Sequence, residues 1–177
     1  MHISRNLNKI PSYAITLGAF DGLHLGHQAL IAALKNIPNT FSALITFSSH
    51  PQAILHPETP FTPLLTEKEK LTLLDQFGLD LVVILPFTPE VPYDKFLTCL
   101  HKKLHFSHLL LGEGATFGKD RKGDAASVRA FSKNLEFEVT YIPKVTYKGK
   151  IISSSRIREA LNKGDTLETE AMLGRSL

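Results

Sequence analysis

The sequence predicts an α/β fold in which a doubly wound parallel sheet forms a single domain. Short apolar runs that suit buried strands alternate with amphipathic helical patterns along the whole chain, as in successive βαβ units. No internal repeat, low-complexity tract or interdomain linker interrupts this alternation. The 177 residues, 43% hydrophobic and 21% charged, are enough for one globular domain with a substantial core.

Composition narrows the classes of function. Twenty basic and seventeen acidic residues give a net charge of +3, which is too small to indicate nucleic-acid binding by itself. The single cysteine, Cys99, excludes an intrachain disulfide or a cysteine zinc site, and its apolar helical neighbours predict a structural role. The sequence contains no signal-peptide core and no membrane-spanning apolar run. We therefore expect a cytoplasmic protein without a membrane or nucleic-acid partner.

The first strand and the first helix enclose a glycine-rich turn. Residues 14–17 are strand-like, Gly18 and Gly22 interrupt the pattern, and from Gly26 the apolar residues recur at helical spacing. A helix that begins directly after a strand offers unpaired backbone N–H groups and the positive end of its dipole. This turn is therefore a candidate phosphate-binding loop.

Two histidines, His24 and His27, lie at the start of that helix. Because they are three residues apart, their rings can point toward one ligand, and Gly26 between them leaves the backbone open to close approach. They could donate hydrogen bonds to the charge that develops on a transferring phosphate. The alternative is a pair of ordinary surface-loop histidines, which the surrounding glycines and the strand-to-helix switch disfavour.

The later elements follow in chain order. We expect strands at 41–47, 79–85, 108–111 and 137–142, and helices at 66–77, 93–104, 125–135 and after residue 155. Thr66 and Glu69 form a capping box for the first of these helices. The proline-rich segment 48–63 is predicted to be a loop, in which His50 is either a ligand-binding residue or a capped loop histidine.

Two further segments are candidates for ligand binding. The loop 112–124 contains four glycines and mixed charges, and it is either a functional loop or a surface excursion. Residues 153–155 are serines that can cap the last helical stretch, and together with Arg156 and Arg158 they could hold phosphate oxygens. In a doubly wound sheet these loops lie beyond the carboxyl ends of the strands, near the switch point at which we expect the site.

The segments GAFDGLHLGH and ISSSRIRE together resemble the HxGH nucleotidyltransferase superfamily. With ITFSSHP, LTEKEKLTLLDQFGLD, GEGATFGKDRKGD and the terminal LGRS, the chain resembles more narrowly the adenylyltransferase module of bacterial bifunctional riboflavin kinase/FAD synthetases. The resemblance spans nearly all 177 residues. It implies a Rossmann-like nucleotidyltransferase fold, with residues 1–177 as one FMN adenylyltransferase domain.

The resemblance also implies a reaction and its residues. In this family the phosphate of FMN attacks the α-phosphate of ATP, which gives FAD and pyrophosphate, usually with Mg²⁺. By motif, His24 and His27 would be the catalytic residues. ATP binding would fall to Gly18, Phe20, Asp21, Gly26, Ser154, Ser155 and Arg158, and flavin binding to His50, Gly114 and Phe117. The resemblance identifies no metal ligands.

The chain departs from the family pattern at the flavin side. Gly114 and Ala115 stand in GEGATFG where the family reads GEDFRFG or GENFTFG, so a hydrogen-bonding group and an aromatic surface for the flavin are missing. Ser49 replaces the first proline of an FxPHP pattern. The family's riboflavin kinase module would follow LGRS and lies outside these residues. We therefore expect no kinase activity from them, and a separate riboflavin kinase is a possible source of FMN.

Two other functions stay open. One is a nucleotidyltransferase that acts on another phosphorylated metabolite, which the altered GEGATFG loop keeps in consideration. The other is a nucleotide-binding module without turnover, which the intact histidines and the serine and arginine stretch disfavour.

Overall fold

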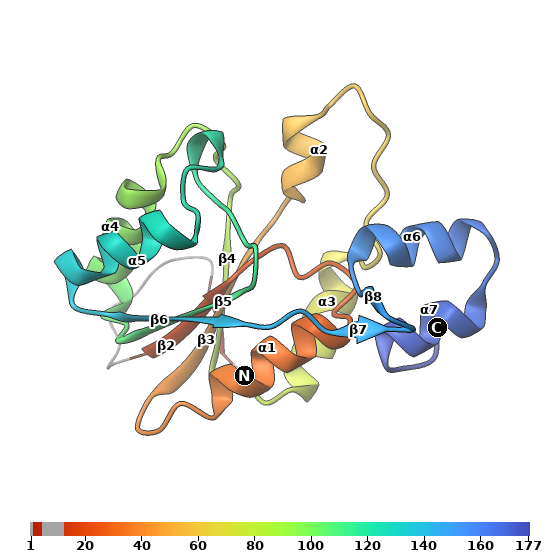
Figure 1. The fold of residues 1–177 in the computed structure, drawn as a ribbon, viewed down its shortest axis with the longest axis horizontal. Coiled ribbons are helices and arrows are strands. Elements are labelled where there is room, and N and C mark those ends of the chain that lie inside the picture. The colour runs from red at the N-terminus through yellow and green to blue at the C-terminus, as the bar shows by residue number, and fades with distance from the viewer. Residues whose placement is uncertain (1, 5–12) are drawn as a thin grey trace.

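The computed structural model describes residues 2–4 and 13–177, and six strands form one parallel sheet (Figure 1). Their order across the sheet is β1-β4-β3-β2-β5-β6, and every neighbouring pair is parallel. The strands are β1 (His2–Ser4), β2 (Tyr13–Leu17), β3 (Phe41–Phe47), β4 (Leu81–Leu85), β5 (His108–Gly112) and β6 (Glu138–Ile142). The predicted fold class is confirmed, and the short edge strand β1 is an addition that the sequence pattern did not indicate.

Helices cover both faces of the sheet (Figure 1). Leu100 and Val128 pack in the core on one face, and Leu34 and Leu74 pack in the core on the other. Alternate residues of each strand point into these two cores, which is why the strands read as continuous apolar runs. Among the described residues, no helix is both long and apolar enough to cross a membrane. The helices are α4 (Tyr93–Leu104) and α5 (Ala125–Leu135) on the first face, and α1 (Leu25–Lys35) and α3 (Glu67–Gln76) on the second.

The strand order reverses at β2, which pairs with β3 on one side and with β5 on the other. From β2 the chain passes through α1 to β3, and from β4 it returns through α4 to β5. The carboxyl ends of β2 and β5 therefore flank the topological switch point, where open α/β sheets bind their ligands. The histidine turn follows β2 directly, as the sequence predicts.

The last part of the chain forms a small unit beside this switch point. It consists of the hairpin β7 (Thr146–Tyr147) and β8 (Lys150–Ile151), followed by α6 (Ser154–Asn162) and α7 (Thr166–Leu173). Its own core includes Ile157 and Met172, and Leu25 of α1 packs against that core. The one helical stretch expected after residue 155 is thus two helices, joined through Gly164, whose φ is +72°.

Two other expectations are wrong. The segment 48–63 is not all loop, because it contains the short helix α2 (Pro51–Leu55), in which proline takes the first helical position and His50 is the N-cap. Cys99 is exposed on α4 and does not contribute to the core. The buried face of that helix passes instead through its neighbour Leu100.

Candidate active site

The turn between β2 and α1 has a bent conformation that buried residues hold in place. Phe20 and Leu23 are almost inaccessible, and their φ angles of +51° and +44° lie in a region that residues other than glycine rarely occupy. Gly22 has a φ of +82°, and a Cβ there would lie 2.7 Å from Cδ1 of Leu64. Position 22 therefore requires glycine, and the turn carries His24 to the start of α1.

His24 and His27 form a stacked pair at the N-terminus of α1. Their ring centroids are 3.7 Å apart, and the ring planes differ by 14°. His24 is the N-cap residue, and its Nδ1 accepts a hydrogen bond from the backbone N–H of His27 at 3.3 Å. A Cβ at Gly26 would lie 3.1 Å from the His24 ring, so glycine leaves room for the stacking. The two rings converge as their spacing predicted.

Both imidazoles are neutral near pH 7. Burial lowers the pKa of His24 to about 4 and lowers the pKa of His27 well below its usual value, with smaller contributions to the latter from His24 and Lys70. Because Nδ1 of His24 accepts a hydrogen bond, the proton of its neutral ring is assigned to Nε2. Nδ1 of His27 is buried and lacks a hydrogen-bond partner in the described part of the chain. Leaving such a buried nitrogen without a partner is costly.

The histidine pair lines a cavity of about 260 Å³ at the switch point, which we call the histidine cavity. One wall comes from the turn and the start of α1, and the opposite wall from the segments that follow β5 and β6. Three of the seven predicted ATP-binding residues, Gly18, Phe20 and Gly26, lie in its lining, and so does Ala115 of the GEGATFG loop. The cavity thus joins residues that are more than eighty positions apart, as expected for a nucleotide site between β2 and β5.

Asp21 points away from that cavity and joins three segments. Its buried carboxylate accepts hydrogen bonds from the backbone N–H groups of Leu64, at 2.9 Å, and Leu65, at 3.3 Å. The same carboxylate forms an ion pair with Arg158 of α6. Ser154, also from α6, donates a hydrogen bond to the backbone carbonyl of Asp21 at 2.8 Å. These predicted ATP-binding residues therefore come together, and in this structure they bind one another.

Arg158 makes two further contacts with the segment that precedes α3. Its Nε donates a hydrogen bond to the carbonyl of Thr62 at 3.0 Å, and its guanidinium carbon lies 4.5 Å from the ring centroid of Phe61. The His50 ring stacks on the same phenylalanine, with centroids 4.2 Å apart. Nδ1 of His50 accepts a hydrogen bond from the backbone N–H of Gln52 at 3.1 Å, so this histidine caps α2.

A second cavity, of about 280 Å³, lies on the β3 side of the turn, and we call it the lysine cavity. Its lining includes Ala19, Asp21, His50 and Lys70. Lys70 comes from α3 and was missed by the sequence reasoning. The sequence does contain a pattern that could have identified Lys70. It is four residues before the buried Leu74 and so lies on the core-facing side of an amphipathic helix.

A third, smaller pocket of about 90 Å³ contains four phenylalanines and is called here the phenylalanine pocket. Phe117 lies in it, with Gly118, whose Cβ would come within 2.5 Å of the Tyr93 backbone. Phe47 lines both this pocket and the lysine cavity. The remaining aromatic rings of the pocket are those of Phe87 and Phe96.

The three residues predicted to bind flavin do not share one cavity. His50 lies in the lysine cavity and Phe117 in the phenylalanine pocket. Gly114, with a φ of +77°, lies beside Lys144, whose Nζ would be 3.2 Å from a Cβ at position 114. The 3₁₀ turn η1 (Lys119–Arg121) follows in the same loop.

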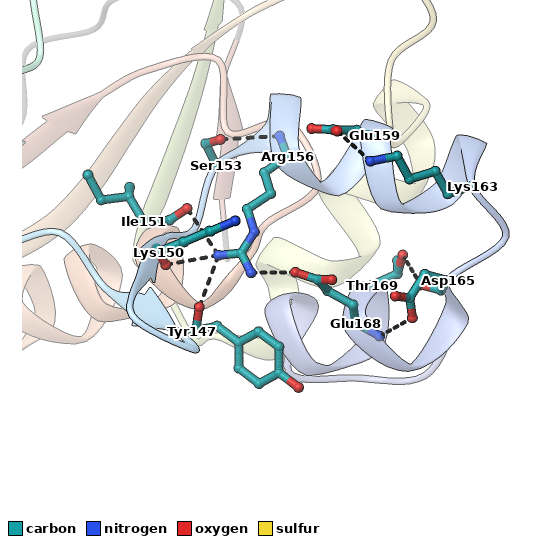
Figure 2. A network of polar contacts seen from close by, with 10 residues as sticks. All are labelled: Tyr147, Lys150, Ile151, Ser153, Arg156, Glu159, Lys163, Asp165, Glu168 and Thr169. Carbon is teal, nitrogen blue, oxygen red and sulfur yellow. Dashed lines mark hydrogen bonds and ion pairs between the residues drawn. The ribbon is translucent and has the colours of Figure 1, made fainter.

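The serines and arginines at the start of α6 have separate tasks, and Figure 2 shows those of Ser153 and Arg156. Ser153 accepts a hydrogen bond from the backbone N–H of Arg156 at 3.2 Å and so caps the helix. Arg156 forms an ion pair with Glu168 of α7 and donates hydrogen bonds to three carbonyls of the β7–β8 hairpin. The Arg156 guanidinium therefore holds the C-terminal unit together, and its contact with phosphate oxygens stays a prediction. Ser155 is exposed on the first turn of α6.

The side chains do not form a ready metal site in the described part of the chain. Nowhere within it do three histidine, cysteine, aspartate or glutamate side chains converge. Asp21, the acidic residue of the turn, already binds Arg158 and two backbone N–H groups.

Comparison with known proteins adds to this geometry. The model of a family described as FAD synthetase matches residues 7–156, a range that contains the turn, the cavities and the start of α6. The chain belongs to the FAD synthetase family. Its relatives include a bifunctional riboflavin kinase/FMN adenylyltransferase from Listeria monocytogenes, 32% identical over 183 residues that cover 96% of this chain and 54% of the relative. An FAD synthetase from the same species is 31% identical over 180 residues, which cover 98% of this chain and 73% of that protein.

The chain thus spans about half the length of the first of these FAD synthetase relatives. A crystal structure described as a macrolide-efflux protein from Streptococcus pneumoniae superposes with a TM-score of 0.84 at 24% sequence identity. That comparison covers 98% of this chain and 61% of the other. At this identity the likeness establishes the fold alone, and it agrees with the nucleotidyltransferase-like architecture that the motifs implied.

Proposed function

We propose that this protein is an FMN adenylyltransferase, which transfers the AMP moiety of ATP to FMN and yields FAD and pyrophosphate. The observation that carries the proposal is that successive residues of the turn after β2 line two different cavities. Gly18 and Phe20 line the histidine cavity, whereas Ala19 and Asp21 line the lysine cavity. A turn between two cavities can bring two phosphorylated ligands together, one from each side. Membership of the FAD synthetase family supports ATP and FMN as those ligands.

In this proposal ATP occupies the histidine cavity, with its α-phosphate at the start of α1. One phosphate oxygen of FMN attacks the α-phosphorus, the new P–O–P bond forms, and the bond to the departing pyrophosphate breaks. The Nε2–H of His24 and the N-terminal backbone of α1 donate to the oxygens on which charge accumulates. The FMN phosphate is already ionised near pH 7, so the reaction requires positioning and charge stabilisation and needs no protein base.

Arg158, Ser154 and Ser155 are proposed to contact the β- and γ-phosphates. They lie on α6, next to Asp21 of the turn. The guanidinium of Arg158 has five N–H donors, and its bonds to Thr62 and Asp21 use the Nε and one Nη group. Its second Nη group is the donor that we assign to ATP.

The phenylalanine pocket is proposed to hold part of the isoalloxazine ring. Flat aromatic ligands bind favourably against aromatic side chains, and Phe47, Phe87, Phe96 and Phe117 gather in this pocket. Because Phe47 also borders the lysine cavity, a flavin seated there can extend its ribityl phosphate toward the turn.

Mg²⁺ is proposed to enter with ATP as part of the substrate. Magnesium commonly binds through nucleotide phosphates and water with few protein ligands, which suits the lack of a converging acidic cluster in the described residues. Residues 1–177 would then form one adenylyl-transfer domain in the cytoplasm. The FMN that it uses must come from a kinase reaction that phosphorylates riboflavin.

The test is an acceptor panel. The purified protein would be incubated with MgATP and either FMN, riboflavin, phosphopantetheine or glycerol 3-phosphate, while pyrophosphate release and FAD are measured. We expect pyrophosphate and FAD in equal amounts with FMN, and neither with riboflavin, which lacks the attacking phosphate. Release with another acceptor alone, or ATP binding without any release, would contradict the proposal.

A further inference from the structure

The ammonium group of Lys70 lies inside the lysine cavity with a charge that its hydrogen bonds do not neutralise. Nζ donates to the carbonyl oxygen of Ala19 at 3.2 Å and to Oγ1 of Thr46 at 3.1 Å, both uncharged atoms. Thr46 is fully buried and also donates to the Ala19 carbonyl at 3.2 Å, so the three groups form a closed triangle. An ammonium has three N–H donors, of which this triangle uses two. The lysine is therefore fixed in place and keeps a donor for another partner.

Two acidic residues, Asp21 and Glu67, line the lysine cavity with Lys70, and Lys70 is the group there that can meet an anion. Burial lowers the pKa of Lys70, while the carboxylates of Asp21 and Glu67 raise it. The oxygens of Asp21 are already bound by Arg158 and by two backbone N–H groups. His50 completes the cavity from the opposite side. A partly buried ammonium in such a site interacts strongly with an incoming phosphate, because little solvent separates them.

The position of the lysine cavity indicates which ligand would carry a phosphate bound there. The histidine cavity borders the same turn through Gly18 and Phe20. A nucleotide bound there therefore approaches the turn from a different side than a ligand in the lysine cavity. The lysine cavity shares Phe47 with the phenylalanine pocket, and it shares the turn with the site of transfer. A phosphate in the lysine cavity therefore belongs to the ligand whose ring lies in the phenylalanine pocket.

We propose that Lys70 binds the phosphate of the acceptor, FMN, and orients it toward the nucleotide in the histidine cavity. This inference rests on the proposed function and adds to it a residue that distinguishes FMN from riboflavin. The ammonium contacts the substrate through its third N–H, while its bonds to Ala19 and Thr46 hold it at a fixed distance from the turn.

The experiment measures flavin affinity by fluorescence titration, with FMN and riboflavin as separate probes. The variants are Lys70→Met, which removes the charge, and Lys70→Gln, which removes the charge but keeps an N–H donor for the Ala19 carbonyl. Lys68→Met is the matched control, because Lys68 is exposed on the same helix. Binding of a non-hydrolysable ATP analogue is measured for every variant by calorimetry.

We expect both Lys70 variants to bind FMN about tenfold to a hundredfold more weakly, as is typical when a hydrogen bond between charged groups is lost. Riboflavin affinity should stay within about twofold of the wild type, and Lys68→Met should change neither value. The criterion is therefore the ratio of FMN to riboflavin affinity. That ratio would not move if Lys70 only supported the turn, since both flavins would then weaken alike.

Three results would overturn the inference. They are an unchanged FMN affinity, an equal loss for FMN and riboflavin, and a loss confined to the ATP analogue. If Lys70→Met does not fold, Lys70→Gln alone decides the question. Failure of the proposed function looks different, because the wild type itself would then form no FAD or show no preference for FMN over riboflavin.

Discussion

Helices α1 and α6 begin at two places that look alike in the sequence and differ in the structure. Each follows a strand-like segment, each has glycine or serine in its first turn, and each was a candidate phosphate site. At α1 the His24 and His27 rings stack over a cavity, and Nδ1 of His27 is buried without a partner in the described chain. At α6 the Ser153 side chain caps its own helix, and the side chains of Ser154 and Arg156 are bound to other parts of the protein.

This difference distinguishes a helix start that faces a cavity from one whose side chains support the fold. The start of α1 places two imidazole rings at a cavity and leaves a buried nitrogen without a partner in the described chain, which is common at functional sites. The start of α6 uses its polar atoms to fix the C-terminal unit and the turn. Substitutions at α1 should therefore change the rate, and substitution of Arg156 on α6 should mainly change stability, with Arg158 between the two.

The largest expected effect is that of His27→Ala on turnover. Loss of one donor to a developing charge typically lowers the rate by about 10² to 10³, which corresponds to about 3 to 4 kcal/mol. ATP affinity should fall much less, because the contact strengthens in the transition state. Turnover and ATP affinity would be measured on the folded variant, with His56→Ala at an exposed position as the control. If His27→Ala kept near wild-type turnover, the start of α1 would not contribute to the rate, and the proposed difference between α1 and α6 would be wrong.

A second prediction concerns the pH dependence of stability. His24 has a pKa of about 4 in the folded protein, compared with 6.5 in an unfolded chain. Between these values the unfolded chain binds the proton more strongly, so the free energy of unfolding falls as the pH falls from about 6.5 to 4, by about 3 kcal/mol for this residue. Above pH 6.5 the contribution of His24 to the free energy of unfolding no longer changes with pH.

This can be measured by urea unfolding at several pH values. His24→Asn keeps a good N-cap and removes the titrating ring, so its stability should vary less between pH 6.5 and 4 than that of the wild type. His56→Asn should retain the full pH dependence. A His24→Asn curve parallel to the wild type would show that the buried pair does not titrate as its burial requires.

Arg156→Ala should destabilise the protein with a smaller effect on the reaction. The substitution removes the ion pair with Glu168 and three hydrogen bonds to the hairpin, and a loss of about 2 kcal/mol is expected. Lys163→Ala, which breaks the exposed pair with Glu159 in the same region (Figure 2), should change stability little. If Arg156→Ala abolished ATP binding while stability was unchanged, Arg156 would be a phosphate ligand and not a support of the C-terminal unit.

The smallest effect is expected for Arg158→Lys. The charge is kept, but an ammonium cannot bind Asp21, Thr62 and a phosphate in the planar geometry of a guanidinium. KM for ATP should rise about fivefold to tenfold, or about 1 kcal/mol, with a smaller change in kcat. Steady-state kinetics with varied ATP at saturating FMN would measure this. Unchanged constants would assign Arg158 to the supporting frame together with Arg156.

Local sequence patterns were sufficient to predict the fold class and the part of the site formed by the turn after β2. Short continuous apolar runs bounded by turn residues are typical of strands buried on both faces, and their alternation with helices leaves few topologies besides a doubly wound sheet. The glycines and the two histidines lie within ten residues of one another, so their spacing alone brought them together. The resemblance by motif added the family, which the comparison then confirmed.

The sequence by itself determined the class of fold, the position of the turn and the convergence of His24 and His27, because these depend on interactions between near neighbours in the chain. Only the tertiary structure decided that Arg158 points to Asp21 while Arg156, two residues earlier, points to Glu168. Residues two positions apart on a helix lie about 200° apart around its axis, so what each one meets depends on which elements pack against that side. Lys70 became part of the site for the same reason, since the carbonyl and hydroxyl that bind it come from the turn after β2 and from β3, which are distant from α3 in the sequence.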